Sequence, residues 1–376
     1  MKIQSRRRLA SVTGVALVGT FAISGCGSDN NSSASPSAGA AKASAVDCAK
    51  GTLSGEGSSA QKNAIEQAIT DFQTACPGAT VNYNPTGSGA GIKQFIAGQV
   101  GFAGSDSALK TKPKEGASNI EQADADKTCG SPAWNIPMVT GPIAVAYNVK
   151  GVDKLILTPA VTAKIFDGTI KTWNDPAIAA INPGITLPAT PITVFFRSDE
   201  SGTTENFTKY LNTAAPKEWT AKPAKKWTGK GQGKEKSAGV ASGVKATDGG
   251  ITYVEWSYAK DNNLGIAQID NGAGPVELSG AAVGKAVSAA KQTGTGNDLS
   301  LKLDYATKEA GAYPILLVTY EIVCSKGKDP AQAKLTKAFL KSFAAADMQT
   351  KLQEIGYAPL PTDIQAKVLT SVNALS

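Results

Sequence analysis

The sequence contains no histidine among its 376 residues. This absence excludes a Ser-His-Asp triad, because no imidazole can take the proton of a serine, and it excludes metal sites built on histidine. No cluster of aspartate and glutamate in the sequence suggests a dinuclear metal centre either. We therefore expect no metal, no cofactor and no enzymatic activity.

A membrane-spanning run is also missing. The uncharged, largely apolar stretch 9–25 is too short and too weakly apolar for a convincing span, and it follows a basic start at residues 2–8, which is typical of an export signal. Residues 23–26, Ile-Ser-Gly-Cys, resemble the lipobox of bacterial lipoproteins, in which cleavage leaves a lipid-modified cysteine. We expect a signal peptide over 1–25 and lipid on Cys26, with a plain signal peptide as the alternative.

A large excess of charge of one sign is also missing from the exported part of the chain. Removal of residues 1–25 takes away four basic residues and no acidic one, so the formal net charge falls from +7 to +3. Such a mild excess gives little support to a nucleic-acid partner. Residues 27–46 are rich in Ser, Ala, Gly and Asn, so we expect a disordered tether over 26–47 between the lipid and a folded domain.

Cysteine is rare as well, but its number is informative. Four cysteines remain beyond Cys26, and an even number in an exported chain suggests two disulfides. Sequence alone allows three pairings, and free buried thiols are the alternative. Cys48 precedes the first expected strand and Cys76 ends the first expected helix, which would put both at the same end of neighbouring parallel strands. This order favours Cys48 with Cys76, and Cys129 with Cys324.

What the chain does contain is a distinctive segment at residues 193–211. Its β-branched and aromatic start predicts a buried strand, and Phe207, Tyr210 and Leu211 recur at the spacing of a helix face. The turn between strand and helix supplies a guanidinium, hydroxyls and free backbone N–H groups from Arg197, Ser198, Asp199, Glu200, Ser201, Gly202 and Thr203. A helix start of this kind favours an anion, although Ser201 or Thr203 as a simple helix cap is the alternative.

Two earlier segments repeat the arrangement of strand, Gly/Ser loop and helix. A strand that begins at 52–53 breaks at the loop 54–60, before an amphipathic helix. A second strand at 80–83 breaks at the loop 85–91, before another helix. Neither loop is a Walker A or a Gly-x-Gly-x-x-Gly motif. Three hydroxyl-bearing helix starts and one arginine favour a small tetrahedral oxyanion over a nucleotide, with simple turns as the alternative for each loop alone.

Asp106 follows a strand expected within residues 100–105 and carries a negative charge, opposite to that of Arg197 and of the helix starts. Taken alone it could be a helix cap. In an anion site its carboxylate could only accept hydrogen bonds, and hydrogen phosphate has a P–OH to donate. Sulfate has no such proton, so its oxygen would be left unpaired and repelled. A carboxylate here therefore predicts selectivity for phosphate over sulfate.

The rest of the chain predicts a second region joined to the first by long strands. The apolar segments 136–148 and 313–323 are expected to cross between two lobes, and residues from 149 to about 305 alternate helix and strand signals. The run 217–236 holds seven lysines and two tryptophans, a nucleic-acid-like combination, but glycine and proline interrupt it, so we expect a solvated loop. Two helices with a break at 356–361 end the chain.

Together these motifs resemble the substrate-binding lipoprotein of the bacterial phosphate-specific ABC transporter. The similarity covers residues 48–365, and the motifs that carry it are Gly55-Glu56-Gly57-Ser58-Ser59, Thr86-Gly87-Ser88-Gly89-Ala90-Gly91, Gly104-Ser105-Asp106, Arg197 to Thr203, and Gly356-Tyr357-Ala358-Pro359-Leu360-Pro361. The resemblance implies an α/β, two-lobed periplasmic-binding-protein-like fold (type II), in which each lobe is a mixed sheet flanked by helices, with a two-strand hinge and the ligand in the cleft. Lobe I would be residues 48–140 plus 306–376, and lobe II residues 141–305.

The resemblance also implies the ligand contacts. The residues that would contact phosphate are Ser59, the backbone of Ala60, Ser88, Asp106, Arg197, Ser201, Gly202 and Thr203. Asp199 would hold the guanidinium of Arg197 by a salt bridge. Many members of the family have Thr-Phe in place of Ser59-Ala60, but serine keeps the hydroxyl and alanine keeps the backbone N–H. Glu56 replaces a small residue and adds a negative charge near the cleft.

The function that the resemblance implies is that of a monomeric receptor, anchored by lipid on Cys26 to the extracytoplasmic face of the cell membrane. It would bind inorganic phosphate, close its lobes, and deliver the ion to the permease subunits of an ABC importer, with no nucleic acid as partner. The alternatives are a phosphatase-like enzyme with Ser88 or Ser201 as nucleophile, and a surface adhesin or structural lipoprotein.

Overall fold

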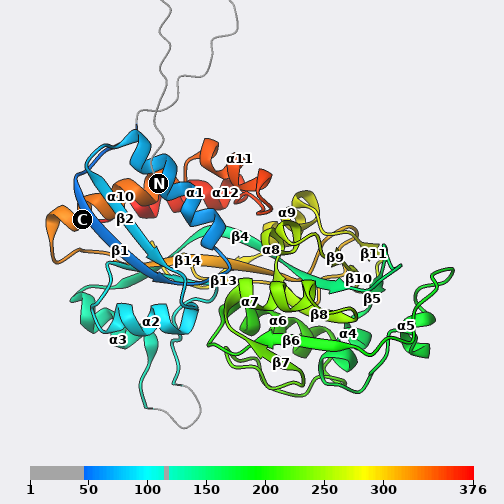
Figure 1. Ribbon diagram of the computed structural model, residues 1–376. Helices are drawn as coiled ribbons and strands as arrows, with labels where there is room; N and C mark the ends of the chain where they lie inside the picture. The colour runs from blue at the N-terminus through cyan, green and yellow to red at the C-terminus, as the bar shows by residue number, and fades with distance from the viewer. Residues whose placement is uncertain (1–45, 114–117) are drawn as a thin grey trace, which may run out of the picture. The chain divides into compact units, whose positions relative to one another are not determined.

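The computed structural model describes residues 46–113 and 118–376 (Figure 1). Within them, nine strands form one mixed sheet in the order β2-β1-β3-β14-β4-β8-β6-β7, with β9 paired to β4. The strands of this sheet are β1 (Gly51–Gly57), β2 (Ala79–Asn84), β3 (Phe102–Ser105), β4 (Ala133–Asn148), β6 (Thr193–Arg197), β7 (Gln232–Lys234), β8 (Gly250–Glu255), β9 (Gly265–Ile266) and β14 (Leu316–Cys324).

Short strands and helices complete the described chain. The short strands are β5 (Ile156–Leu157), β10 (Gln268–Asp270), β11 (Pro275–Val276), β12 (Lys291–Gln292) and β13 (Leu301–Lys302). The helices are α1 (Lys62–Ala75), α2 (Ser88–Ile96), α3 (Glu121–Cys129), α4 (Pro159–Phe166), α5 (Pro176–Ala179), α6 (Gly202–Ala214), α7 (Lys236–Lys245), α8 (Trp256–Asp261), α9 (Gly280–Ser288), α10 (Pro330–Phe343), α11 (Ala346–Glu354) and α12 (Thr362–Asn373).

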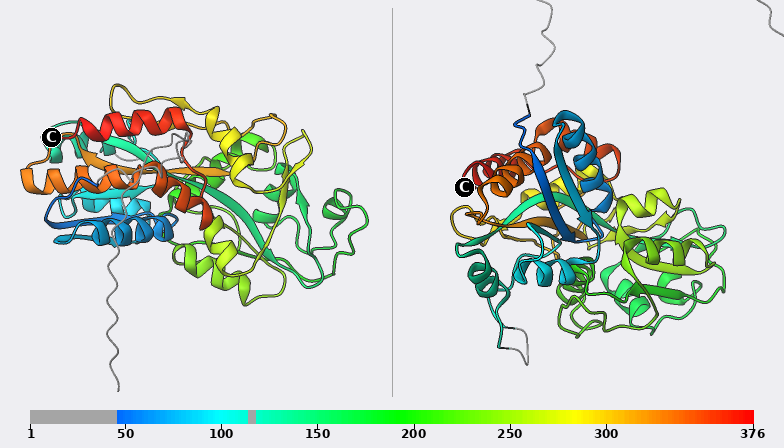
Figure 2. Two further views of the ribbon diagram at one scale, coloured as in Figure 1. Left: turned by 90° about the horizontal axis from the view of Figure 1, so that it is seen from above. Right: turned by 60° about the vertical axis from the view of Figure 1, so that its left-hand side comes forward.

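The long strands β4 and β14 join the two ends of the main sheet. The first half of β4 pairs antiparallel with β14, and its second half pairs antiparallel with β8. Both strands are buried over nearly their whole length, as the apolar segments 136–148 and 313–323 predicted. In Figures 1 and 2 they run between the β1–β3 end, with α1, α10 and α12, and the β6–β8 end, with α6 and α7. We call these ends the first and the second strand group.

Parallel pairing within each group brings the predicted loops to common edges. β1 is parallel to β2 and β3, and β6 is parallel to β7 and β8. The carboxyl ends of parallel strands lie at the same edge of a sheet, and ligands bind outside that edge. The helices α2 and α6 begin at such edges, directly after the loops that follow β2 and β6.

The first predicted strand is longer than expected, and the predicted break at Ser54 is wrong. β1 continues to Gly57 because it is hydrogen-bonded to β2 on one side and to β3 on the other. Gly55 suits this crowded position, since a Cβ there would lie 2.1 Å from the ring of Phe102. The loop that carries the polar residues therefore begins at Ser58.

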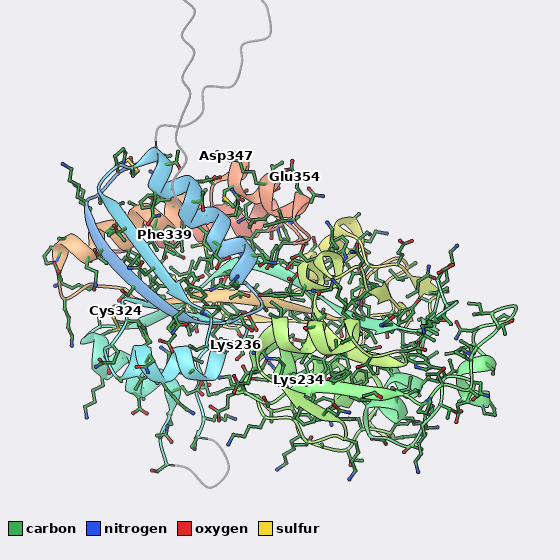
Figure 3. All side chains as sticks on the ribbon, in the orientation of Figure 1. Lys234, Lys236, Cys324, Phe339, Asp347 and Glu354 are labelled. Atoms are coloured by element: carbon green, nitrogen blue, oxygen red, sulfur yellow. A yellow bond between two sulfur atoms is a disulfide. The ribbon has the colours of Figure 1, made fainter. Side chains whose placement is uncertain are left out.

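Two further expectations need correction. Three helices, not two, follow β14, because the chain turns at Ala344–Ala345 between α10 and α11, and α12 follows the break at 356–361. The lysine run 217–236 is not simply a solvated loop: Trp219 is 3% exposed, and Lys225 is buried with its ammonium 3.4 Å from the carboxylate of Glu121. Lys234 lies on the exposed strand β7 (Figure 3).

The structure contains two disulfides, Cys48–Cys76 and Cys129–Cys324, the pairing favoured by the order of elements along the chain. The first joins the segment before β1 to the end of α1. The second joins α3 to the end of β14, where Figure 3 labels Cys324. Buried free thiols are therefore the wrong alternative for these residues.

The signal peptide, Cys26 and the tether up to residue 45 lie outside the described residues. Asp47, near the end of the expected tether, contacts the folded unit, since its carboxylate is 2.6 Å from the ammonium of Lys341. Within the described ranges, no helix is long and apolar enough to cross a membrane.

Aromatic rings fill the core behind the first strand group. Phe339 of α10, labelled in Figure 3, has its ring centroid 5.6 Å from that of Phe72 in α1 and 6.0 Å from that of Phe102 in β3. Phe102 in turn lies directly over Gly55. The close approach of β1 and β3 therefore depends on a glycine at position 55.

This dependence can be tested with a pair of Gly→Ala substitutions. Gly55→Ala forces a methyl group into the ring of Phe102, and overpacking of this kind costs about 1–3 kcal/mol. Gly284→Ala is the matched control, because a Cβ there meets nothing within 4 Å in the helix α9. Alanine in a helix is favoured over glycine by about 0.5–1 kcal/mol. In urea unfolding, the free energy of unfolding should therefore decrease for Gly55→Ala and increase for Gly284→Ala. Equal stability of the two variants would contradict this packing.

Candidate functional site

The candidate site is centred on Asp106, directly after β3. Asp106 is 3% exposed, and its carboxylate accepts hydrogen bonds from the hydroxyls of Ser58, Thr203 (3.1 Å) and Thr319 (2.9 Å). Burial raises the pKa of Asp106, and the hydroxyl donors together with the charge of Arg197 oppose that shift. Asp106 is therefore not a helix cap but an acceptor that collects donors from three separate segments.

Arg197, the last residue of β6, is the buried cation of the site. Its Nε donates to Asp199 at 2.7 Å, its Nη2 makes an ion pair with the other carboxylate oxygen, and its Nη1 donates to Ser237 at 3.3 Å. Asp199 also accepts the backbone N–H of Lys236 at 3.0 Å. Although burial opposes ionisation of Asp199, the hydrogen bond and charge of Arg197 lower its pKa. The salt bridge expected between Arg197 and Asp199 is thus present.

The start of α6 lies against the first strand group. Gly202 is the first residue of this helix, and a Cβ on it would lie 2.6 Å from the Cβ of Asp106 and 2.6 Å from the Oγ of Ser88. Only glycine allows this approach. Ser201 caps the helix, since its Oγ accepts the N–H of Thr204 at 3.2 Å. The capping alternative for Ser201 is therefore present in the structure, while Thr203 turns its hydroxyl to Asp106.

The two earlier loops supply the other predicted residues. Ser88 is the first residue of α2, and its Oγ accepts the N–H of Asp106 at 3.1 Å. The Oγ of Ser59 lies 3.1 Å from the Oγ of Ser237 and accepts the N–H of Ser237. The N–H of Ala60 is bonded to Ser58 Oγ at 3.1 Å. The structure thus brings all the predicted residues to one region, with Ser59 near Arg197 and Ser88 near Asp106.

Sequence reasoning missed three contributors as separate site residues. Ser58 lies within a motif that was noted, but the pattern did not show that its hydroxyl bonds to Asp106. Ser237 is the second residue of α7, a fourth helix start at the same edge. Thr319 is a hydroxyl inside the apolar strand β14, and this polar interruption is a signal that could have found it.

The carboxylate of Glu56, which was expected to add a negative charge near the cleft, has a local hydrogen-bond partner. It is half-buried in β1, and its Oε1 accepts the hydroxyl of Thr86 at 2.7 Å. This bond ties the end of β1 to the loop before α2. Glu56 therefore has a local partner among the first-group loops.

Ion pairs connect the two strand groups around the site. Lys93 of α2 lies 2.6 Å from Glu200, and the ammonium of Lys110 pairs with Glu205 of α6. The backbone N–H of Gly89 also donates to the carbonyl of Glu200 at 3.0 Å. The loops of the first group and the start of α6 are therefore in direct contact in this structure.

A cavity of about 860 Å³ adjoins the site at Asp106, which is part of its lining. Asn206 helps to form its wall and donates to the backbone carbonyl of Asp106 at 2.7 Å. Its lining does not include Arg197, Ser88 or Ser201. The cavity therefore reaches Asp106 but not these three residues. Within the described residues, no group of three histidine, cysteine, aspartate or glutamate side chains could hold a metal ion.

The comparisons with known proteins agree on one family. A model described as a PBP superfamily domain matches residues 42–347. "Phosphate-binding protein PstS 3" of Mycobacterium leprae is 44% identical over 369 residues, which cover 96% of this chain and 98% of the relative. "Phosphate-binding protein PstS 2" of Mycobacterium tuberculosis is 43% identical over 375 residues, which cover 98% of this chain and 99% of the relative.

Solved structures share the fold at low sequence identity. The phosphate-bound periplasmic protein PfluDING has a TM-score of 0.67 at 21% identity, with 85% of this chain and 93% of that chain covered. A putative phosphate ABC transporter substrate-binding protein from Clostridium perfringens has a TM-score of 0.60 at 18% identity, with 83% of this chain and 100% of that chain covered. The fold is thus the α/β PBP-like fold predicted from sequence.

Fold and site together define a solute-binding protein of the PBP-like class, with converging polar groups at the ends of its parallel strands. The chain belongs to the PBP superfamily and, within it, to the PstS family.

The Arg197–Asp199 pair predicts a pH-dependent stability. Because the pKa of Asp199 is lowered in the folded protein, its contribution is fully present above the unfolded value of 3.8 and is lost as pH falls through the folded pKa. Asp199→Asn should therefore lower the thermal midpoint at neutral pH, and the difference from wild type should shrink as the pH drops below about 4.

Asp347→Asn is the control for this experiment. Asp347 is exposed on α11, where Figure 3 labels it. We expect its substitution to change the midpoint by much less than Asp199→Asn. A difference between Asp199→Asn and wild type that stays constant from neutral to acidic pH would contradict the salt bridge as its cause.

Proposed function

We propose that the protein is an extracytoplasmic receptor that binds inorganic phosphate between its two strand groups and delivers it to the permease subunits of an ABC importer. The observation that carries the proposal is the buried carboxylate of Asp106, which accepts from Thr203 and lies within the electrostatic influence of the buried Arg197. Its backbone N–H donates to Ser88, at the start of α2. The relatives named phosphate-binding proteins over nearly the whole chain support the same ligand.

The proposed ligand shell follows from the positions of these groups. Ser59, the N–H of Ala60, Ser88 and Asp106 come from the first strand group, and Arg197, Ser201, Gly202 and Thr203 come from the second. The start of α6 adds the partial positive charge and free N–H groups of a helix N-terminus. Asp106 would accept the proton of hydrogen phosphate, which sulfate lacks.

The division into lobes remains part of the proposal. Lobe I would comprise residues 48–140 plus 306–376, and lobe II residues 141–305, with β4 and β14 as the hinge. Each lobe supplies part of the ligand shell, so phosphate would bind the closed arrangement better and shift the population towards it. The contacts of Gly89 and Lys93 with Glu200 would then belong to the closed state.

The proposal extends to the membrane. Lipid on Cys26 would anchor the mature chain, residues 26–47 would tether it, and the receptor would act as a monomer. Cys26 lies outside the described residues, so this part rests on the lipobox-like sequence at 23–26. Mass spectrometry of the exported chain tests it, since an unmodified or uncleaved N-terminus would contradict the anchor.

The rival functions have less support. A phosphatase-like enzyme would need a base beside Ser88 or Ser201, but the sequence has no histidine, and these hydroxyls accept N–H groups from Asp106 and Thr204. The relatives are named binding proteins, not enzymes. An adhesin or structural lipoprotein would leave the buried Asp106 and Arg197 without a purpose.

Calorimetry with phosphate and sulfate tests the ligand. Purified, ligand-free protein should bind phosphate tightly and sulfate at least about 100-fold more weakly, because sulfate leaves the carboxylate of Asp106 unpaired. Asp106→Asn should reduce that preference, since an amide can donate to sulfate. If folded protein gives no heat of binding with phosphate, the proposal is refuted. If Asp106→Asn has unchanged selectivity, Asp106 does not determine the preference for phosphate over sulfate.

Arg197→Lys tests the cation. A lysine cannot keep both bonds to Asp199 and the bond to Ser237, so we expect phosphate affinity to fall by roughly 10- to 100-fold. Lys93→Ala is the control, because it removes a positive charge near the site from a side chain that is 69% exposed. Its effect should be less than about 1 kcal/mol. Equal losses in the two variants would indicate general charge attraction instead of a positioned guanidinium.

A further inference from the structure

The proposed phosphate shell does not use Glu321, which is a buried acid two residues after Thr319 on β14. Alternation along the strand puts Thr319 and Glu321 on the same face, and the hydroxyl of Thr319 donates to Asp106. Glu321 is 0% exposed, and neither of its carboxyl oxygens has a hydrogen-bond partner among the described residues. A carboxylate in such a place is costly.

The neighbour that can satisfy Glu321 is Gln61, in the loop before α1. Glu321 is paired across the sheet with Gly104 of β3, and a Cβ on Gly104 would lie 2.0 Å from the Nε2 of Gln61. Gln61 therefore sits directly over the residue opposite Glu321. Its own Oε1 also has no hydrogen-bond partner among the described residues.

Gln61 connects this pair to the site. Its Nε2 donates to the hydroxyl of Tyr83 at 3.0 Å, and that hydroxyl donates to the backbone carbonyl of Ser58 at 2.9 Å. The side chain of Ser58 donates to Asp106. Two hydrogen bonds thus link Gln61 to the backbone of Ser58, whose side chain contacts the carboxylate at the centre of the site. At the end where Glu321 lies, the Oε1 of Gln61 lacks a donor within the described part of the chain.

A protonated carboxylic acid is the donor that fits. It supplies one O–H where a carboxylate supplies none. Burial raises the pKa of Glu321 to about 8; the amide of Gln61 opposes this shift, and the charge of Asp106 adds to it. Tyr83, which faces Glu321 from β2, has a pKa raised well above 10, so Tyr83 stays neutral. Ile136 of β4 is paired with Glu321 on the other side.

We infer that Glu321 is a neutral carboxylic acid that donates to Gln61 and thereby positions the Ser58 loop and Asp106 for phosphate. The inference rests on the proposed phosphate-binding function. Glu321 is a positioning residue, because it acts through Gln61, Tyr83 and Ser58. Its neutrality also keeps a second negative charge away from an anion that already faces Asp106.

Ionisation of Glu321 therefore has a defined effect on binding. Bound phosphate adds negative charge near Glu321, so the complex holds the proton of Glu321 more tightly than the free protein does. Phosphate affinity must then fall as the pH rises through the pKa of Glu321 in the free protein. The loss is at most tenfold for each pH unit above that pKa.

The test compares phosphate affinity in wild type, Glu321→Gln and Glu354→Gln from about pH 6.5 to about pH 9.5, a range that brackets the pKa of Glu321. Glutamine keeps the shape and replaces the O–H donor of the acid with an N–H donor, but it cannot ionise. Glu354 is exposed at the end of α11 and serves as the matched control (Figure 3). Phosphate's own titration is common to all three proteins, so it cancels in the affinity ratios.

The expected result is a ratio of Glu321→Gln to wild-type affinity that is near one at the lowest pH and rises to roughly tenfold or more at the highest. Glu354→Gln should follow wild type throughout. A ratio that stays constant across the range overturns the inference. If wild type binds no phosphate at neutral pH, the proposed function fails instead, so the two failures are distinguishable.

A second measurement on wild type covers the case in which Glu321→Gln does not fold. Infrared difference spectra between neutral and alkaline pH should show the loss of a C=O stretch from a protonated carboxylic acid, in the absence of phosphate. Where Glu321→Gln does fold, the same band should be missing from its spectra. No loss of such a band in wild type overturns the inference.

Discussion

The site depends on one constraint: a single buried carboxylate must be satisfied by hydroxyl groups from distant parts of the chain. Asp106 receives them from Ser58, Thr203 and Thr319, which belong to the loop after β1, the start of α6 and the strand β14. No local segment could supply all three. The hydroxyl donors that stabilise the carboxylate of Asp106 are therefore in place only when β14 packs beside β3 and the start of α6 approaches them.

The charged groups near this carboxylate have partners of their own. The buried guanidinium of Arg197 forms an ion pair with Asp199 through Nε and Nη2. Its Nη1 donates to Ser237, which lies beside Ser59. A tetrahedral oxyanion placed between the two groups would meet donors from both strand groups and one acceptor. If Glu321 is neutral, as inferred, Asp106 is the negative charge that such an anion faces. Selectivity and affinity then have separate origins, with selectivity from Asp106 and affinity from Arg197 and the helix starts.

Local sequence determined a large part of this protein. Residue periodicity predicted the strand and helix of 193–211, the apolar strands β4 and β14, and the helix starts that carry Ser88 and Gly202, because these signals depend only on neighbours along the chain. The resemblance of the motifs then indicated the family, and the order of elements favoured the disulfide pairing found. Glycine-rich stretches misled at one point, since Gly55 was taken for a loop residue although β1 runs through it.

Tertiary structure decided what depends on contacts between distant residues. It decided that β1 continues to Gly57, because hydrogen bonds from both β2 and β3 outweigh the weak strand preference of glycine. It also decided that Ser58, Ser237 and Thr319 join the site and that Trp219 and Lys225 are buried within a lysine-rich run. Composition shows which groups can ionise or donate, but only the fold determines which of them meet, and burial then decides the charge that each one carries.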